Sequence, residues 1–377
     1  MKNNETLSGQ IYEYLKEQIR NGAFPEGRLP TEVELAKQFF VSRITSKNAL
    51  TKLAEEGLIV RIQGKGSFVR AESPHGKMLS PVRPQRHCIA LVMGGYTSSF
   101  GLDVLNGALN EAQQRSCHLV VDTTNNDQAY ESRIVESLIK DGVEGLIVQP
   151  AHGELYSKQI LNAIYSGYPV VMLDRAMQGI DAPFVGVDNC ALSCMAVQKL
   201  LDEGHTDIAL LAVADERSSS IRERMDGYMA AYVNNRIAVD KDLWLVNMSG
   251  VFGEAPELLS SAYTYECYVE QIVEHLRKHP QITAIFGTEY RISKAAWDAV
   301  RRIGKQVPKD ISLVSFDMDS SYVGSHTMSY IKQPQTEMGQ KAVQILCDIV
   351  NGSPAETTQC LLEGQWVDGG SIAARLE

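Results

Sequence analysis

Residues 24–69 constrain the fold more than any other stretch, because signals for helix starts and turns follow one another there at short spacing. Thr31 and Glu34 have the spacing of a capping box, which predicts the start of a helix. Ser42, a short turn further on, is a good N-cap for the next helix. The glycine-rich run at 63–66, between two β-prone stretches, predicts a hairpin. This order is typical of a helix-turn-helix followed by a two-stranded wing.

The helix that follows Ser42 is predicted to have one apolar and one polar face. Three residues are expected to pack inward: Ala49, Leu50 and Leu53. Four residues share the outward face near its N-terminal end: Arg43, Ile44, Lys47 and Asn48. In helix-turn-helix proteins this part of the second helix enters the major groove of DNA. A basic surface on a three-helix unit can also be a merely solvated face, but the density of motifs makes that interpretation the weaker one.

The distribution of charge indicates different partners for the two parts of the chain. The net charge of the 377 residues is −10, which alone argues against nucleic-acid binding. Residues 1–70, however, hold 11 Lys and Arg against 8 Asp and Glu, a charge of +3, and the remainder carries −13. A mildly basic head on an acidic body keeps non-specific DNA binding weak and leaves one face available for phosphates.

The motifs of the head resemble those of the GntR-family winged helix over nearly all of residues 6–70. They are Gly27, Leu29-Pro30, Glu34-Leu35-Ala36, Val41-Ser42-Arg43, Ala49-Leu50, Leu53, Glu56-Gly57-Leu58 and Gly64-Lys65-Gly66-Ser67-Phe68-Val69. The resemblance implies that six residues contact DNA, the last two from the wing: Ser42, Arg43, Thr45, Lys47, Gly64 and Lys65. We expect Ser42 to cap the helix as well.

The head departs from the family pattern at Ile44, Ser46 and Lys47, where relatives more often have a polar residue, an aliphatic residue and an arginine. A lysine is a point charge, whereas arginine can bond a guanine with two parallel donors. Lys47 is therefore expected to hold phosphate, and Arg43 is the better candidate for reading a base.

Length and composition predict the domain boundaries and the cellular location of the protein. We expect a DNA-binding domain at 1–70, a linker at 71–86 that contains Pro74, Pro81 and Pro84, and a large domain at 87–377. No apolar run is long enough to span a membrane, and the N-terminus lacks a signal core, so a cytoplasmic location is expected.

The seven scattered cysteines are expected to be reduced, because the cytoplasm keeps thiols reduced. No His or Cys cluster completes a zinc site around Cys190 and Cys194, so no cofactor is expected.

Short apolar strands alternate with helical segments throughout the large domain. Strands are predicted at 89–93, 119–122, 145–148, 170–174, 208–213, 282–286 and 311–316, and helices at 103–115, 129–140, 190–203, 223–235, 265–279 and 292–303. This alternation predicts an α/β class with doubly wound parallel sheets. Almost 300 residues of this pattern should form two lobes.

Polar residues stand at the ends of several of these strands. Ligands of open α/β sheets bind beyond the carboxyl ends of the strands. The candidates there, together with an arginine at the start of a helix, are Asp174, Arg175, Thr288, Glu289, Asp317, Gln333 and Arg224. Carboxylate, guanidinium and amide groups suit adjacent sugar hydroxyls, which both donate and accept hydrogen bonds. Tyr96 or Phe100 could cover the apolar face of a sugar.

A second set of motifs resembles the lactose-repressor family of sensors over about residues 87–350. The motifs are Val187-Asp188-Asn189, Gly204-His205, Arg222 with Arg224 and Gly227-Tyr228, Pro308 with Ile311-Ser312-Leu313-Val314 and Phe316-Asp317, and Gln333-Pro334 with Met338-Gly339. The resemblance implies a periplasmic-binding-protein-like fold in which five residues hold sugar hydroxyls: Asp174, Arg175, Arg224, Asp317 and Gln333. Thr288-Glu289 departs from the Asn-Asp that is usual in the family.

A GntR-type head on this body resembles the arabinose-repressor subgroup. That resemblance implies a homodimeric repressor of carbohydrate-utilisation genes, bound to palindromic operator DNA and released by arabinose or a similar free monosaccharide. Activation by sugar is the less favoured direction.

Other interpretations remain open at this stage. A phosphosugar effector would need more cationic groups than Arg175 and Arg224 supply. A sugar-metabolising enzyme is less favoured, since the sequence has no phosphate loop, no G-x-S-x-G and no H-E-x-x-H motif. Asp174 and Arg175 could form a purely structural ion pair. Asp188 and Asn189 are more typical of a helix cap than of a ligand contact.

Overall fold

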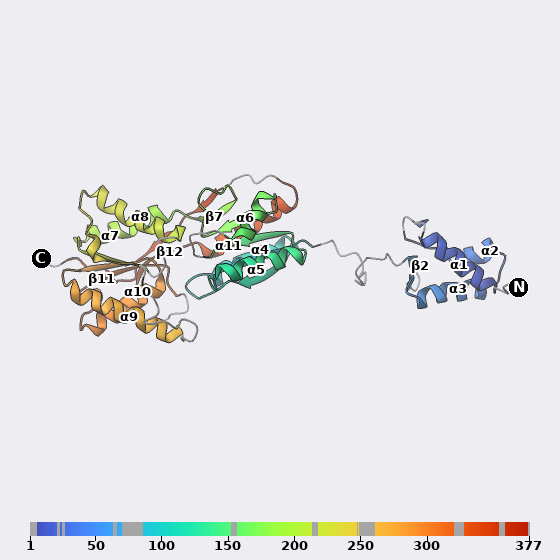
Figure 1. The fold of residues 1–377 in the computed structure, drawn as a ribbon, viewed down its shortest axis with the longest axis horizontal. Coiled ribbons are helices and arrows are strands. Elements are labelled where there is room, and N and C mark those ends of the chain that lie inside the picture. The colour runs from blue at the N-terminus through green and yellow to red at the C-terminus, as the bar shows by residue number, and fades with distance from the viewer. Residues whose placement is uncertain are drawn as a thin grey trace. The chain divides into compact units, whose positions relative to one another are not determined.

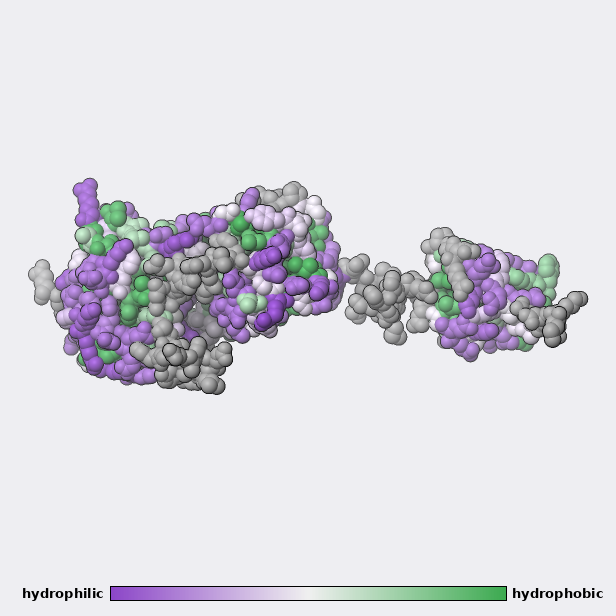
Figure 2. Space-filling view, viewed as in Figure 1, coloured by the Kyte–Doolittle hydropathy of each residue, from purple (hydrophilic) through white to green (hydrophobic). Residues whose placement is uncertain are grey.

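The computed structural model divides into two compact units, Met1–Gln85 and Arg86–Glu377 (Figure 1). It describes residues 6–20, 23–24, 27–62, 66–69, 86–151, 157–212, 218–246, 248, 261–319, 328–353 and 359–375. The predicted linker at 71–86 lies outside the described residues except for its last residue. None of the described helices combines the length and apolar character needed to cross a membrane. The visible face of both units is predominantly hydrophilic, with small apolar patches (Figure 2).

The first unit is a winged helix-turn-helix. Its elements are α1 (Leu7–Arg20), α2 (Glu32–Gln38), α3 (Arg43–Glu55) and the antiparallel strands β1 (Ile59–Ile62) and β2 (Gly66–Val69). The capping box of Thr31 and Glu34 is confirmed, and the side chain of Ser42 accepts from the backbone N–H of Thr45. The predicted inward residues of α3 are buried in the core beside Leu15 and Leu35.

The turn between α2 and α3 holds a residue in an unfavourable conformation. Phe40 has a φ of 52°, and the residue is 95% exposed. The left-handed region is costly for any side chain with a Cβ, and Phe40 gains no packing in return.

Phe40→Gly is therefore expected to stabilise the head by roughly 1 kcal/mol, because glycine adopts this conformation without strain. Thermal unfolding of the full chain, followed by a signal from the head, measures the change. Lys37→Gly, at an exposed position within α2, is the matched control and should destabilise by a similar amount. A Phe40→Gly head that unfolds at a lower temperature contradicts the strain argument.

The first lobe of the second unit contains a six-stranded sheet in the order β13-β7-β6-β5-β3-β4, with all neighbours parallel. Its strands are β3 (Cys88–Met93), β4 (His118–Thr123), β5 (Gly145–Val148), β6 (Val170–Leu173), β7 (Phe184–Val187) and β13 (Gln359–Leu362). One face packs on α4 (Leu102–Gln114) and α11 (Gln335–Val350). The other face packs on α5 (Gln128–Lys140) and α6 (Lys158–Tyr165).

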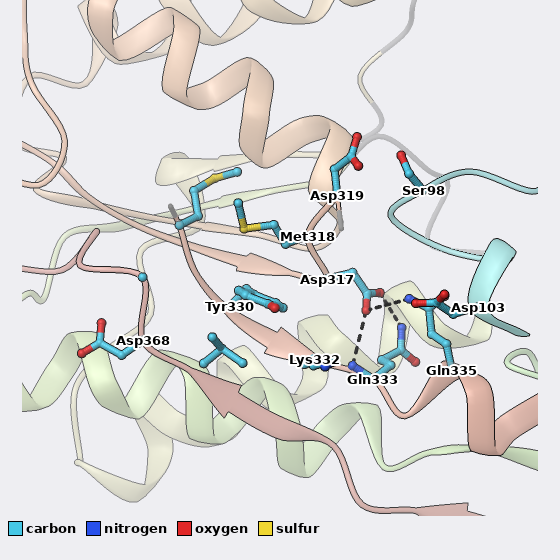
Figure 3. A pocket seen from close by; sticks show the side chains of 13 residues that line it. Ser98, Asp103, Asp317, Met318, Asp319, Tyr330, Lys332, Gln333, Gln335 and Asp368 are labelled. Carbon is cyan, nitrogen blue, oxygen red and sulfur yellow. Dashed lines mark hydrogen bonds between the residues drawn. The ribbon is translucent and has the colours of Figure 1, made fainter. Parts of the chain in front are cut away.

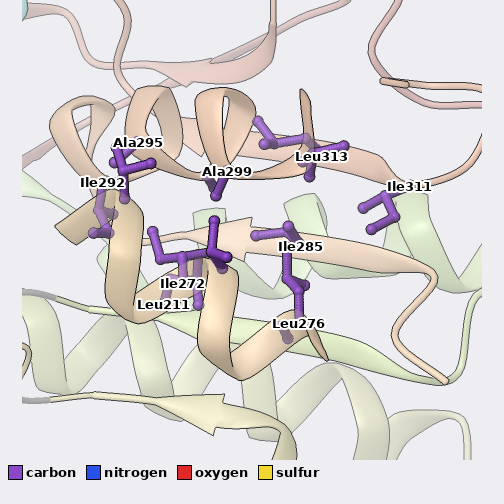
Figure 4. Close-up of a cluster of buried hydrophobic side chains, with 14 of the residues drawn as sticks. Leu211, Ile272, Leu276, Ile285, Ile292, Ala295, Ala299, Ile311 and Leu313 are labelled. Carbon is purple, nitrogen blue, oxygen red and sulfur yellow. The ribbon is translucent and has the colours of Figure 1, made fainter. Parts of the chain in front are cut away.

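The second lobe repeats this strand order as β14-β12-β11-β10-β8-β9, and only its edge strand β14 is antiparallel. Its strands are β8 (Ile208–Leu211), β9 (Trp244–Leu245), β10 (Ala284–Gly287), β11 (Ser312–Phe316), β12 (Ser329–Lys332) and β14 (Gln365–Val367). Helices α7 (Asn189–Asp202) and α8 (Ser219–Asn234) cover one face. Helices α9 (Ser261–Lys278) and α10 (Tyr290–Arg302) cover the other, around Ile272, Ile285 and Leu313 (Figure 4).

The chain passes between the lobes at three places: from β7 to α7, from β12 to α11, and from β13 to β14. The structure thus confirms the predicted α/β class with doubly wound parallel sheets in two lobes. Because the two sheets have the same strand order, β6 of the first lobe and β11 of the second occupy equivalent positions. Each is the fourth strand of its lobe in the sequence.

Candidate functional site

Charged side chains from both lobes gather beyond the ends of the parallel strands. Asp174 and Arg175 follow β6 of the first lobe, Glu289 follows β10 and Asp317 follows β11 of the second. Arg224 lies in the second turn of α8, where it interacts electrostatically with Asp174, Glu289 and Asp317. Residues widely separated in the sequence thus converge, as expected at the carboxyl ends of the strands in open α/β sheets.

Asp174 and Asp317 occupy equivalent positions in the two lobes and share the same unusual geometry. Their φ angles are 61° and 60°, in the left-handed region. Each carboxylate accepts a hydrogen bond from a glutamine amide: Asp174 from Gln149 at 2.7 Å and Asp317 from Gln333 at 2.6 Å. Both aspartates are buried. Strained residues of this kind cluster at ligand-binding sites, where the surrounding structure holds them in place.

Arg224 is the buried cation of the second lobe. Its Nε–H donates to the Oδ1 of Asn189 at 2.8 Å, and its Nη1 donates to the backbone carbonyl of Thr288 at 2.6 Å. Its guanidinium lies 3.6 Å from the centre of the Phe316 ring. Burial lowers the pKa of Arg224 and the carboxylates nearby oppose that shift, beginning with Asp174. The guanidinium is therefore fixed between an aromatic face and neutral acceptors.

Arg175 is the corresponding cation of the first lobe. Its Nη1 donates to the Oδ1 of Asn126 at 2.9 Å and to the carbonyl of Pro150 at 3.0 Å. Its Nε lies 3.7 Å from Asp174 and has no hydrogen-bond partner in the described part of the chain. The Oε1 of Gln333 is likewise buried and unpaired among the described residues. A buried donor and a buried acceptor without partners are costly, so the cluster is incomplete as it stands.

Two carboxylates of the cluster, those of Asp317 and Glu289, have a pKa that is shifted towards the neutral form. Burial raises the pKa of Asp317 to about 6, although Arg224 and the bonds from Gln333 act in the opposite direction. Burial also raises the pKa of Glu289, against the effect of Arg224 and Arg175. Five carboxylates, including those of Glu223 and Glu131, face the two guanidinium groups, so the cluster has no excess of positive charge and suits an uncharged ligand with many hydroxyl groups.

A cavity of about 450 Å³ adjoins the cluster at Asp317 and Gln333 (Figure 3). It continues past Tyr330 and Lys332 of β12. The side chains of Gln333 and Gln335 point toward Asp317 in this view (Figure 3). Gln335 also donates to the carbonyl of Ser99 in the first lobe, at 2.7 Å, so the β12–α11 crossover ties both lobes to the cavity wall. No group of side chains suited to a metal ion is present among the described residues.

The two aromatic candidates do not line this cavity. Tyr96 packs against the core of the first lobe, and its hydroxyl donates to the carbonyls of Asp122 at 3.0 Å and Leu91 at 3.3 Å. Phe100 packs against the same core. Two other aromatic rings lie at the site: Phe316 packs on Arg224, and Tyr330 lines the cavity. Neither ring was predicted from the sequence.

The remaining candidates are placed as follows. The hydroxyl of Thr288 donates to the carbonyl of Leu211, and the backbone carbonyl of Thr288 accepts the hydrogen bond from Arg224. Asp188 caps α7 through the N–H of Ala191, as predicted.

The head presents a groove of about 600 Å³ between α2, the start of α3 and the two wing strands. Glu32 lies within it and pairs with Arg43, whose Nε is 3.1 Å away, and with Arg61. Burial raises the pKa of Glu32, but the bonds from Arg43 and Arg61 outweigh it and lower the pKa overall. Arg61 also donates to the Oγ1 of Thr51 at 3.1 Å. The groove therefore holds two arginines that a single carboxylate orients.

Of the predicted DNA contacts, Arg43 lines this groove, and Ser42, Thr45 and Lys47 lie beside it in sequence, at the N-cap and in the first turns of α3. The side chain of Arg43 is 71% exposed, Lys47 is exposed, and the hydroxyls of Ser42 and Thr45 are 2.8 Å apart. Gly64 and Lys65 lie outside the described residues. Glu32 was not predicted, because an acidic residue in the first turn of a helix is already explained by the helix dipole.

Comparison with known families divides the chain in the same way. Residues 7–69 match the family of bacterial regulatory proteins called the gntR family. Residues 197–372 match the periplasmic binding protein-like domain.

Among curated relatives, the arabinose metabolism transcriptional repressor of Halalkalibacterium halodurans is 25% identical over 354 residues, covering 90% of this chain and 89% of the relative. The ribose operon repressor of Escherichia coli K12 is 24% identical and covers 70% of this chain and 75% of its own. Both relatives are named as regulators, not as enzymes.

Solved structures show the same fold. The transcription regulator CcpA of Lactococcus lactis superposes with a TM-score of 0.66 at 19% identity, over 76% of this chain and all of that one (100%). A LacI family regulator of Enterococcus faecium with bound ribose superposes with a TM-score of 0.63 at 18% identity, over 77% of this chain and 100% of that one.

Proposed function

Because the chain joins a GntR-family helix-turn-helix domain to a periplasmic-binding-protein-like domain, we propose that it is a sugar-responsive transcriptional repressor. Its effector is a free monosaccharide that binds between the lobes. The residues proposed to contact the sugar are Asp174, Arg175, Arg224 and Asp317, and at the edge of the site Gln333, Glu289 and the backbone carbonyl of Thr288. Arabinose is the first candidate, since relatives that align with 90% and 86% of this chain carry that name.

The observation that carries this proposal is the pair of unpaired buried groups, the Nε–H of Arg175 and the Oε1 of Gln333. A sugar hydroxyl both donates and accepts, so one polyhydroxyl ligand can satisfy each of them. The left-handed conformations of Asp174 and Asp317 hold two further acceptors toward the same region. Binding would complete a polar network that the protein alone leaves incomplete.

The charges of the cluster favour a free sugar over a phosphosugar. Arg224 already donates to Asn189 and to the carbonyl of Thr288, and Arg175 to Asn126. Four carboxylates face Arg224, those of Asp174, Asp317, Glu289 and Glu223, and Glu131 also faces Arg175. A phosphate brings a charge near −2 and would repel these carboxylates unless further donors reached it.

The head would bind DNA through the start of α3 and the wing. We propose contacts from Ser42, Arg43, Thr45 and Lys47, with Gly64 and Lys65 from the wing. The protein would act as a homodimer on palindromic duplex operators, each head on one half-site. Sugar that closes the lobes would lower operator affinity, and operator must then weaken sugar binding by the same factor.

A thermal-shift panel of the full chain tests the effector. The panel contains arabinose, ribose, glucose, cellobiose and the phosphates of the monosaccharides. A ligand at 100 times its dissociation constant adds about 2.7 kcal/mol of stability, which is easily detected. We expect one free monosaccharide to stabilise the protein and to release it from DNA in a gel-shift assay. A response to phosphosugars alone, or to none of these compounds, contradicts the proposal.

Arg43→Ala is expected to weaken operator binding by roughly 1–3 kcal/mol, with most of the loss confined to the cognate sequence. Lys47→Ala should weaken binding to all duplexes alike and reduce its salt dependence, since a lysine holds phosphate. Titrations of both variants on operator and random DNA separate the two roles. An equal loss on both duplexes for Arg43→Ala makes this residue a phosphate contact.

A further inference from the structure

The outward face of α3 carries an aliphatic side chain that the fold of the head does not use. Ile44 is 70% exposed and is absent from the described core of the head. The inward face of the same helix is buried at Ser46, Ala49, Leu50 and Leu53. Ile44 therefore points away from the core, on the side where Lys47 and Asn48, three and four residues further on, are also exposed.

Neither helix stability nor packing explains this residue. A β-branched side chain loses rotamer freedom in a helix and is a poorer helix former than lysine, glutamine or glutamate. A single exposed aliphatic residue is unremarkable on most surfaces. This one, however, follows the cap at Ser42 and lies next to Arg43, at the end of the helix that enters the major groove in this fold.

The edges of the bases in the major groove present one apolar group, the 5-methyl group of thymine. We propose that Ile44 contacts a thymine methyl group in each half-site and thereby selects an A·T pair at that position. The exposed amide of Asn48, one turn further along the same face, is of the type that pairs with adenine. This inference rests on the proposed function, because it requires that the head binds DNA.

The test removes the methyl group from the DNA and the side chain from the protein. A duplex operator is first selected from a random pool with the full chain. Each thymine of one half-site is then replaced in turn by deoxyuridine, which lacks the methyl group and keeps the hydrogen-bonding edge. Wild-type protein should lose roughly fourfold in affinity at one position, the value of burying one methyl-sized group.

Ile44→Ala should bind the selected operator more weakly and should show no further loss on the duplex with that deoxyuridine. The affinity of Ile44→Val, which retains the branched Cβ but is one methyl group shorter, should lie between those of the wild type and Ile44→Ala. Val233→Ala is the matched control, because it shortens an aliphatic residue of α8 that is 68% exposed and lies in the other unit. This control should keep the full response to deoxyuridine.

The outcomes separate this inference from the proposed function. If the protein enriches no sequence from the pool, the DNA-binding function itself fails. If it selects an operator but Ile44→Ala responds to every deoxyuridine as the wild type does, the thymine contact is wrong. A uniform loss on all duplexes without a change in methyl sensitivity would assign Ile44 to contacts between protein molecules and overturn the inference.

Discussion

Arg224→Ala is expected to lower the free energy of unfolding of the second unit by about 3–5 kcal/mol and to abolish the response to sugar. Arg224 is only 5% exposed, so its removal leaves the buried Asp317 without its cation, and Asp174 and the half-buried Glu289 with Arg175 alone. The Oδ1 of Asn189 and the carbonyl of Thr288 lose their donor at the same time. Uncompensated buried charge is among the most destabilising changes a single substitution can make.

Denaturant unfolding of the full chain measures this effect. Arg222→Ala is the matched control, since Arg222 lies two residues earlier on α8 and donates an exposed hydrogen bond to Gln178 at 3.3 Å. This control should change the stability by less than about 1 kcal/mol, as a partly exposed polar contact does. Equal losses in the two variants would show that Arg224 is not the central cation of the cluster.

Arg224→Lys separates charge from geometry. A lysine keeps the positive charge but cannot bond two acceptors in the fixed directions of a guanidinium. We expect this variant to recover part of the stability and little of the sugar response. Full recovery of the response would mean that charge alone organises the site.

The positions of the charged cluster could be predicted from the sequence because parallel strands present their carboxyl ends together. Asp174 and Asp317 each follow a short apolar run, and this pattern is sufficient to place them at the same edge. Gln149 follows β5 in the same way and pairs with Asp174, so the same rule applied to that strand would have found it.

Other parts of the site depend on information that spacing does not carry. In the sequence, Phe316 is indistinguishable from the other apolar residues of its strand. Its contact with Arg224 depends on how α8 lies across the sheet. Thr288 contributes a carbonyl because of the orientation of its peptide. The edge strands β13 and β14 were not predicted, because they are half-exposed and lack the continuous apolar run of the buried strands such as β5.

Asp317→Ala is expected to keep operator binding and to weaken the sugar response by roughly 10- to 100-fold, the worth of a hydrogen bond to a charged group. Asp317 lies at the junction of the charged cluster and the cavity, and it receives bonds from Gln333 and Gln335. Its loss would therefore remove both a ligand acceptor and the group that orients Gln333. Release from operator as a function of sugar concentration measures the effect, and an unchanged midpoint would remove Asp317 from the binding site.

Asp317→Asn gives a second, independent test through pH. Burial raises the pKa of Asp317 from 3.8 to about 6, so the native protein holds this proton more tightly than the unfolded chain. Stability from this group is therefore present at low pH and is lost as the pH rises from about 4 to about 6. The asparagine variant lacks this dependence, so its stability relative to the wild type should rise across the same window.

The same titration should govern the sugar if Asp317 binds it as a carboxylate. Sugar affinity of the wild type should then fall as the pH drops below about 6, whereas that of Asp317→Asn should be weak and flat across this range. Glu289 also has a raised pKa, so the difference between wild type and variant is the informative quantity. Equal pH profiles for the two proteins would show that the sugar does not depend on the ionisation of Asp317.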